Sequence, residues 1–168
     1  MPDLLVTSIS PVATIYSFDP LDDDGNITWE FGNSIYYFYK ESKTWSEAKA
    51  LAQALGGYLV EIDSIEENNQ LFVKVLENLT PVDIENTIGI DGGKAPYIWL
   101  GGTDGDTTST QETSLWNWKW DNSNIEISKG RPEWGKGWGG EEPDNSQNFQ
   151  HRLALGLEDW SRSNPGKY

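Results

Sequence analysis

The 168-residue sequence contains no cysteine, which excludes disulfide bonds, thiol catalysis and cysteine-held zinc. Basic residues are also scarce: 12 Lys and Arg stand against 27 Asp and Glu, and the formal net charge is −15 at pH 7. A surface this acidic repels phosphate backbones and anionic lipid headgroups. We therefore expect no nucleic-acid partner and no attraction to a membrane surface.

Long hydrophobic runs and a secretory leader are missing as well. No stretch of 18 or more apolar residues is present, so we expect no membrane insertion. The first ten residues, MPDLLVTSIS, have no basic start and no sustained apolar run, and they predict no signal peptide in this sequence. The absence of cysteine does not fix the compartment, because a chain of this length can bury a core without disulfides.

Catalytic signatures are few. His151 is the only histidine, and no serine or carboxylate stands at a recognisable catalytic spacing from it, so we expect it at the surface or at the rim of a site. A glycosidase needs two carboxylates at set separations across a cleft, and no pair among the 27 acids is singled out. We therefore predict that the protein is not an enzyme. A hydrolase is the function with the least support from the sequence.

Aromatic residues, by contrast, are abundant. The sequence holds nine tryptophans, seven tyrosines and five phenylalanines, and five of the tryptophans fall between residues 116 and 138. This content argues against intrinsic disorder despite the high charge. So many indoles in one stretch indicate a compact core layer, a ligand surface, or both.

Two helices have clear beginnings and ends in the sequence. Thr44-Trp45-Ser46-Glu47 is a capping box, because a hydroxyl residue is followed three positions later by a glutamate. An apolar stripe with helical spacing follows and stops at Gly56-Gly57. The stripe consists of Ala48, Leu51, Ala52 and Leu55. Ser64-Ile65-Glu66-Glu67 is a second capping box, and the helix that it opens is expected to end before Pro81.

The remaining sequence predicts strands and one long loop. Residues 1–33 are interpreted as an extended lead-in or linker, with one candidate strand at 12–16, and further strands are expected at 35–39, 58–62, 97–100 and 153–157. Alternating tryptophans at 116, 118 and 120 share one face of a strand, which favours the core. Residues 121–150 lack periodicity, and a loop that long inside a compact domain is usually functional or disordered.

This order of elements resembles the C-type lectin-like domain. Trp45-Ser46-Glu47-Ala48 through to Gly56-Gly57-Tyr58-Leu59 is similar to that family's first helix and the strand after it. Trp99-Leu100-Gly101-Gly102 resembles its Trp-Ile-Gly-Leu core strand. Trp138, followed four residues later by Glu142-Pro143-Asp144, resembles its long-loop tryptophan and its Glu-Pro-Asn sugar-site motif. The resemblance implies an α+β fold, with two helices against a small, mostly antiparallel sheet and a long tryptophan-rich loop region on one side.

The likeness covers residues 34–168, and it has departures. Ala52 and Arg152 stand where members of the family commonly carry cysteines. This cysteine-free version therefore looks more like bacterial or phage members than animal ones. Gly166-Lys167-Tyr168 stands where the family's Trp-Asn-Asp begins, and the sequence ends there. We expect a domain truncated at its carboxyl end, without the Asn and Asp that complete the family's sugar site.

The resemblance also implies a calcium site, since calcium takes six to eight oxygen ligands and prefers carboxylates. Glu142 and Asp144 are the expected ligands of both the metal and the carbohydrate. Asn145 is an auxiliary calcium ligand, and Gln150 stands where the family has a third acidic ligand. Trp134 is a candidate for stacking on a sugar face. The alternative is that the same acidic stretch is a solvated surface turn that binds nothing.

The leading hypothesis is thus a calcium-assisted carbohydrate-binding module of a larger extracellular or cell-surface protein, with a role in adhesion. The second hypothesis is a calcium-independent module of the same fold that binds a partner protein or another surface. Gln150 and the missing Asn-Asp favour this second reading. Glu142 with Asp144 matches neither the Glu/Asn pair usual for mannose-type ligands nor the Gln/Asp pair usual for galactose-type ligands, so the sequence does not name the sugar.

Overall fold

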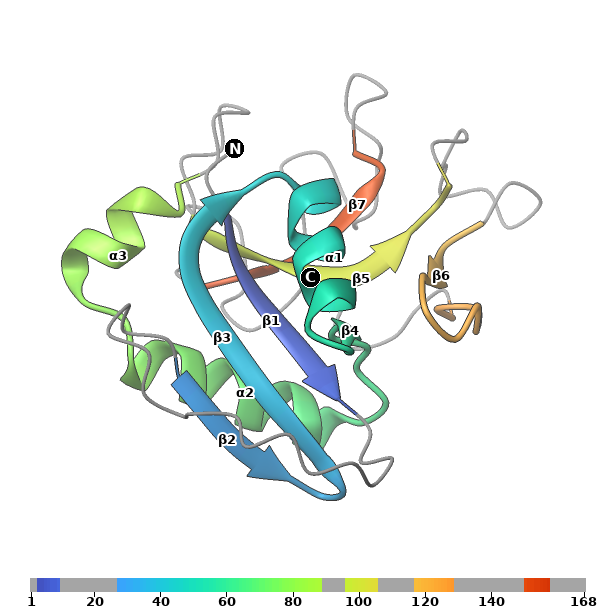
Figure 1. Ribbon diagram of the computed structural model, residues 1–168, viewed down its shortest axis with the longest axis horizontal. Coiled ribbons are helices and arrows are strands. Elements are labelled where there is room, and N and C mark those ends of the chain that lie inside the picture. The colour runs from blue at the N-terminus through green and yellow to red at the C-terminus, as the bar shows by residue number, and fades with distance from the viewer. Residues whose placement is uncertain (1–2, 10–26, 89–95, 106–116, 129–149, 158–168) are drawn as a thin grey trace.

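The computed structural model describes residues 3–9, 27–88, 96–105, 117–128 and 150–157 (Figure 1). In chain order the elements are β1 (Asp3–Ile9), β2 (Ile27–Phe31), β3 (Ser34–Lys43), α1 (Trp45–Ala54), β4 (Tyr58–Leu59), α2 (Ile65–Glu77), α3 (Pro81–Asn86), β5 (Tyr97–Thr103), β6 (Lys119–Trp120) and β7 (Arg152–Gly156). No helix in these ranges is both long and apolar enough to cross a membrane.

The strands form one seven-stranded sheet with β1 in its middle. The order along the sheet is β2-β3-β1-β5-β6, while β4 pairs with β1 and β7 pairs with β5. Every pairing is antiparallel except that of β1 with β5, where Leu4 and Leu5 lie opposite Ile98 and Trp99. The chain therefore has the expected α+β architecture with a mostly antiparallel sheet.

The expected lead-in, residues 1–33, supplies two strands to this sheet. β1 pairs with β3, β4 and β5, so it is a central strand of the domain and not a linker ahead of it. β2 pairs in register with β3 across a turn at Gly32, whose φ of +59° suits glycine. The alternation of Ile27, Trp29 and Phe31 toward the core is the sequence signal for β2. The candidate strand at 12–16 lies outside the described residues.

Helix α1 confirms the first capping box. The Thr44 hydroxyl accepts from the Glu47 N–H, and the Glu47 carboxylate accepts from the Thr44 N–H at 2.8 Å. Gly56, at φ +80°, closes the helix by donating to the Gln53 carbonyl. The buried residues of the helix are Trp45, Ala48 and Ala52. Leu55, expected in the apolar stripe, is 36% exposed, because it is the C-cap where the chain leaves the helix.

Helix α2 begins at the second predicted cap, with a different partner for the glutamate. The Ser64 hydroxyl accepts from the Glu67 N–H at 3.1 Å. The Glu67 carboxylate turns inward instead of returning to Ser64, and it accepts from the Asp63 N–H and from the Tyr36 hydroxyl. Glu67 is only 8% exposed, so the second box is half formed and its acid belongs to the core.

Helix α3 is not among the helices predicted from the sequence, in which Pro81 marks only the end of the preceding helix. Thr80 caps α3, and Pro81 occupies its first turn, where a missing N–H costs nothing. Asp83 completes a capping box with Thr80. The pattern Thr-Pro-x-Asp was the available signal for this helix.

The core lies on both faces of the sheet, which explains the aromatic run in β3. Tyr36 and Phe38 join the cluster that contains Leu71 of α2, whereas Tyr37 and Tyr39 join a second cluster that contains α1 residues. Figure 1 shows α1 in front of β5 and α2 behind β3. The first cluster also holds Trp118 and Trp120, which confirms the core role predicted for this pair. Trp116 lies outside the described residues.

Gly101 lies within β5, which continues through the two glycines where a turn was expected, and it allows β5 to approach β4 closely. The Gly101 N–H donates to the Val60 carbonyl at 2.8 Å, and a Cβ at Gly101 would lie 2.6 Å from the Leu59 carbonyl oxygen. The Trp45 indole donates to the Leu100 carbonyl at 2.8 Å. Backbone contacts and one tryptophan therefore fix β5 against α1 and β4.

Candidate functional site

The structure describes one residue of the predicted calcium and sugar site, Gln150. It is half-buried and lies two residues before β7. The other four predicted residues lie outside the described ranges; they are Glu142, Asp144, Asn145 and Trp134. Trp138 of the long-loop motif also lies outside them. The ligand set therefore stays a prediction.

The end of the sheet next to Gln150 is held by a contact between His151 and the buried carboxylate of Asp104. His151 Nδ1 lies 3.0 and 3.1 Å from the two carboxylate oxygens of Asp104. The Asp104 side chain is 0% exposed and the His151 side chain is 22% exposed. The expectation of a surface or rim histidine is thus met only in part, because one ring nitrogen contacts a buried acid. No catalytic spacing in the sequence marks this pair, since the two residues are 47 positions apart.

A polar network extends this pair into the adjoining strands. The Thr103 hydroxyl donates to the His151 carbonyl at 3.1 Å, and Arg152 Nη1 donates to the same carbonyl at 2.7 Å. The side-chain amide of Asn117 donates to the Asp104 carbonyl at 2.9 Å. Asp104 therefore contacts both Asn117, which follows the range 106–116, and His151, which follows the range 129–149. Gln150 directly follows the longer of those ranges, so the network fixes the place where that range rejoins the sheet.

Arg152 also joins β7 to helix α1. Its guanidinium carbon lies 4.6 Å from the centre of the Trp45 ring, and Lys49 Nζ lies 5.4 Å from the same ring. Cations at these distances are attracted to the face of an indole. Arg152 stands at a position where the resembling family commonly carries a cysteine, so a cation–π contact occupies this position in the cysteine-free chain.

The donor chemistry of the predicted ligand set suits calcium. Glu142 and Asp144 supply carboxylates, while Asn145 and Gln150 supply amide oxygens. Oxygen donors of both kinds are the ligands that calcium takes in proteins. Within the described ranges, no group of three or more His, Cys, Asp or Glu side chains is arranged to hold a metal ion.

Comparison with known proteins points to C-type lectin-like receptors. No family model matches the chain. It is 30% identical to asialoglycoprotein receptor 2 of Rattus norvegicus over 125 residues, which is 74% of this chain and 31% of that receptor. Killer cell lectin-like receptor subfamily I member 2 of Rattus norvegicus is 40% identical over 58 residues, 34% of this chain and 20% of the receptor. Member 1 of the same subfamily and organism is 36% identical over 73 residues, 43% of this chain and 25% of the receptor.

The matched segments thus span between a fifth and about a third of each relative's length. All three relatives are C-type lectin-like proteins, which supports the family resemblance. Together with the helices and the mostly antiparallel sheet, this similarity identifies the architecture as a C-type lectin-like α+β fold. The relatives are rat proteins, and the expected likeness to bacterial or phage members gains no support from them.

Proposed function

We propose that this chain is a calcium-assisted carbohydrate-binding module of a larger protein that acts outside the cell or at its surface. The observation that carries the proposal is the similarity over 74% of the chain to a protein named as an asialoglycoprotein receptor. The sugar-site motif Glu142-Pro143-Asp144 supports the same function. The proposed module binds and does not catalyse, in keeping with relatives that are all named as receptors.

In this proposal Glu142 and Asp144 are the principal calcium ligands, with Asn145 and Gln150 as neutral oxygen donors. A calcium ion held by these residues would supply coordination positions for neighbouring sugar hydroxyls. The two carboxylates then accept hydrogen bonds from the same hydroxyls, because an ionised carboxylate has lone pairs for more than one partner. Trp134 offers an indole face to the apolar side of the sugar ring.

The buried Asp104–His151 pair has a positioning role in this proposal. It anchors the chain next to Gln150, so the amide oxygen of Gln150 is presented from a fixed point of the sheet. Preorganised ligands lose less conformational entropy when an ion or a sugar binds. His151 is therefore a positioning residue and does not itself touch the metal.

Calorimetric titration of the protein with calcium tests this function. We expect binding that Glu142→Ala and Asp144→Ala abolish, because each variant removes a charged oxygen ligand. Glu85→Ala is a matched control, since it removes one exposed acid from α3 without touching the proposed ligands. Calcium that binds only the folded chain raises the melting temperature by mass action, and a chelator reverses this rise. An unchanged melting temperature together with no heat of binding would contradict a calcium site.

A calcium-independent module that binds a partner protein is the second candidate. Two observations favour it: the higher identities belong to the killer cell lectin-like receptors, and Gln150 brings no negative charge to the ligand set. This candidate predicts that ligand binding survives chelation and survives Glu142→Ala. The calorimetric and melting experiments therefore separate the two functions.

A further inference from the structure

We propose that the domain has a second ligand site, a polar pocket beside α1 that binds one neutral saccharide unit without calcium. This site does not rest on the function proposed above, because none of its lining residues belongs to the calcium ligand set. The pocket has a volume of about 260 Å³. It is lined by Lys49, Gln53, Gly57, Tyr58, Leu59, Asp121 and Asn122.

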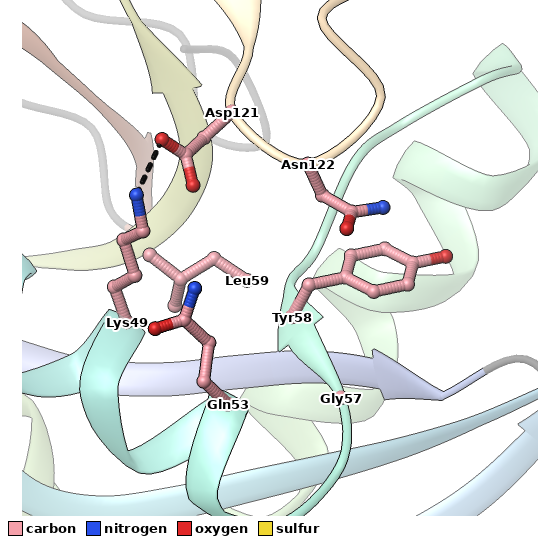
Figure 2. Close-up of a pocket in the computed structure, with 7 residues that line it drawn as sticks. All are labelled: Lys49, Gln53, Gly57, Tyr58, Leu59, Asp121 and Asn122. Atoms are coloured by element: carbon pink, nitrogen blue, oxygen red, sulfur yellow. Dashed lines mark hydrogen bonds and ion pairs between the residues drawn. The ribbon is translucent and has the colours of Figure 1, made fainter.

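Three parts of the fold build the pocket, as Figure 2 shows. Lys49 and Gln53 come from α1, where they lie four positions apart, and Asp121 and Asn122 come from the turn after β6. Tyr58 and Leu59 of β4 lie between these two groups. The pocket is therefore bounded by elements that are distant in sequence and brought together by the sheet.

The wall formed by the turn after β6 is held in place by hydrogen bonds. The Asp121 N–H donates to the Gly101 carbonyl at 2.8 Å, which ties the turn to β5. Glu61 Oε1 accepts from the N–H groups of Asn122 and Ser123 at 2.9 and 2.8 Å. These contacts fix the backbone next to the pocket before any ligand arrives, and a preformed site loses less entropy on binding.

The charges in the pocket compensate one another. Lys49 Nζ lies 2.7 Å from Asp121 Oδ1, and the dashed line in Figure 2 marks this ion pair. Its two members are the only lining residues with a full charge, so the described wall carries no net charge. A phosphate would have to compete with Asp121 for Lys49, and a metal ion would have to compete with Lys49 for Asp121. This arrangement favours a neutral ligand.

The remaining polar groups match sugar hydroxyls. The side chains of Gln53 and Asn122 each carry an amide that both donates and accepts, as a hydroxyl does, and both residues are exposed. The half-buried Tyr58 ring adds a small apolar surface, which suits the C–H face of a pyranose ring, while Leu59 is buried beneath the pocket with 3% of its surface exposed. A volume just below the range of drug-sized sites admits about one sugar ring.

A titration followed by NMR tests this site directly on the whole chain. The ¹⁵N-labelled protein is titrated, in the presence of a chelator, with methyl α-mannopyranoside and separately with methyl β-galactopyranoside. We expect saturable shifts of the side-chain amides of Gln53 and Asn122 and of the backbone amide of Tyr58 with at least one of the two sugars. A ligand of about a dozen heavy atoms in an open site binds in the millimolar range. No saturable shift at these amides with either sugar would overturn the proposal.

Variants assign the binding to the pocket. The double variant Gln53→Ala/Asn122→Ala is expected to weaken sugar binding by about tenfold, because two hydrogen-bonding amides are lost. Gln70→Ala, which removes an exposed amide from α2, is the matched control and is expected to leave binding unchanged. Equal binding by the double variant would place the sugar elsewhere and overturn the proposal. Glu142→Ala is expected to leave this chelator-resistant binding intact, so failure of the calcium site and failure of the pocket give different results.

Discussion

The guanidinium of Arg152 lies 4.6 Å from the centre of the Trp45 ring, so the first residue of β7 packs on the first residue of α1. Trp45 is itself buried, and its indole donates to the Leu100 carbonyl in β5. One tryptophan thus connects a helix to two neighbouring strands. In a chain without disulfide bonds, this contact is one of the links between distant parts of the sequence.

Replacing Arg152 should therefore destabilise the fold. Arg152→Ala removes the cation from the Trp45 ring and two hydrogen bonds, and we expect a loss of about 1–3 kcal/mol in the free energy of unfolding. Arg152→Lys should recover part of the loss, because it keeps the charge but not the planar donor group. Urea denaturation measures both values. Lys74→Ala breaks only an exposed ion pair with Glu77 and should change stability by about 0.5 kcal/mol or less; a similar loss in both alanine variants would contradict the role of Arg152.

The buried Glu67 should make stability depend on pH. Burial raises the pKa of Glu67 above its usual value of 4.5, and the hydrogen bonds from Tyr36 and Asp63 only partly oppose this shift. A group whose pKa is raised in the folded state favours folding when protonated. Its contribution is therefore complete below pH 4.5 and is lost as the pH rises through the folded-state pKa. As the pH rises through the folded-state pKa of Glu67, the wild type should lose stability relative to Glu67→Gln. Urea denaturation at a series of pH values measures this difference in the free energy of unfolding.

Asp83 provides a control, because its effect on the pH dependence of stability should have the opposite sign to that of Glu67. A hydrogen bond from the Thr80 backbone, a second from the Thr80 hydroxyl and the ion pair with Lys40 lower the pKa of Asp83 below its usual 3.8. Its contribution is therefore present above that value and is lost as the pH falls. Relative to Asp83→Asn, the wild type should lose stability toward acid. If the stability of the wild type relative to Glu67→Gln and relative to Asp83→Asn changed with pH in the same direction, the burial argument for Glu67 would be wrong.

Gly101 should not tolerate a side chain. In Gly101→Ala the new Cβ would lie 2.6 Å from the Leu59 carbonyl oxygen, a backbone atom that cannot move without shifting β4. We expect a loss of about 1–3 kcal/mol in the free energy of unfolding, as for other overpacked sites. Gly105→Asn serves as the control, because Gly105 has open space around it and asparagine tolerates its φ of +74°. Comparable melting temperatures for Gly101→Ala and the wild type would contradict the close approach.

Removing the partner of the buried Asp104 should also weaken the fold. His151→Ala leaves the carboxylate without its ring donor, at a cost of about 1–3 kcal/mol. His151→Asn keeps a nitrogen donor close to the position of Nδ1 and should restore part of the stability. Thermal denaturation of the two variants checks the difference. Equal melting temperatures for both variants would indicate that the contact with Asp104 contributes nothing.

The parts of the fold that could be predicted from sequence are those with local signals. Both long helices begin at the expected capping residues, Thr44 and Ser64, because a cap depends on neighbours within four positions. β1 could not be recognised as a central strand, since its partners in β5 lie more than 90 positions away along the chain. The inward turn of Glu67 depends on Tyr36, 31 residues earlier, and no local pattern announces it.

The candidate functional residues also fall into those with a local sequence signal and those without one. The motif Glu142-Pro143-Asp144 is local and was found from sequence, although it lies outside the described residues. The Asp104–His151 pair and the pocket beside α1 bring together residues from separate strands and turns. Spacing along the chain carries no information about such contacts, because only the pairing of the sheet creates them.

The central place of β1 affects how the protein can be shortened. Along the path of the sheet, β1 is the strand that joins the pair β2-β3 to the group around β5. A version trimmed to begin at Ser34, the boundary that the sequence suggested, would lose β1 and β2 together and would leave β3 without either of its partner strands. β1 is therefore part of the fold, and a peptide carrying Asp3–Ile9 could be supplied separately to a version that begins at Ile27.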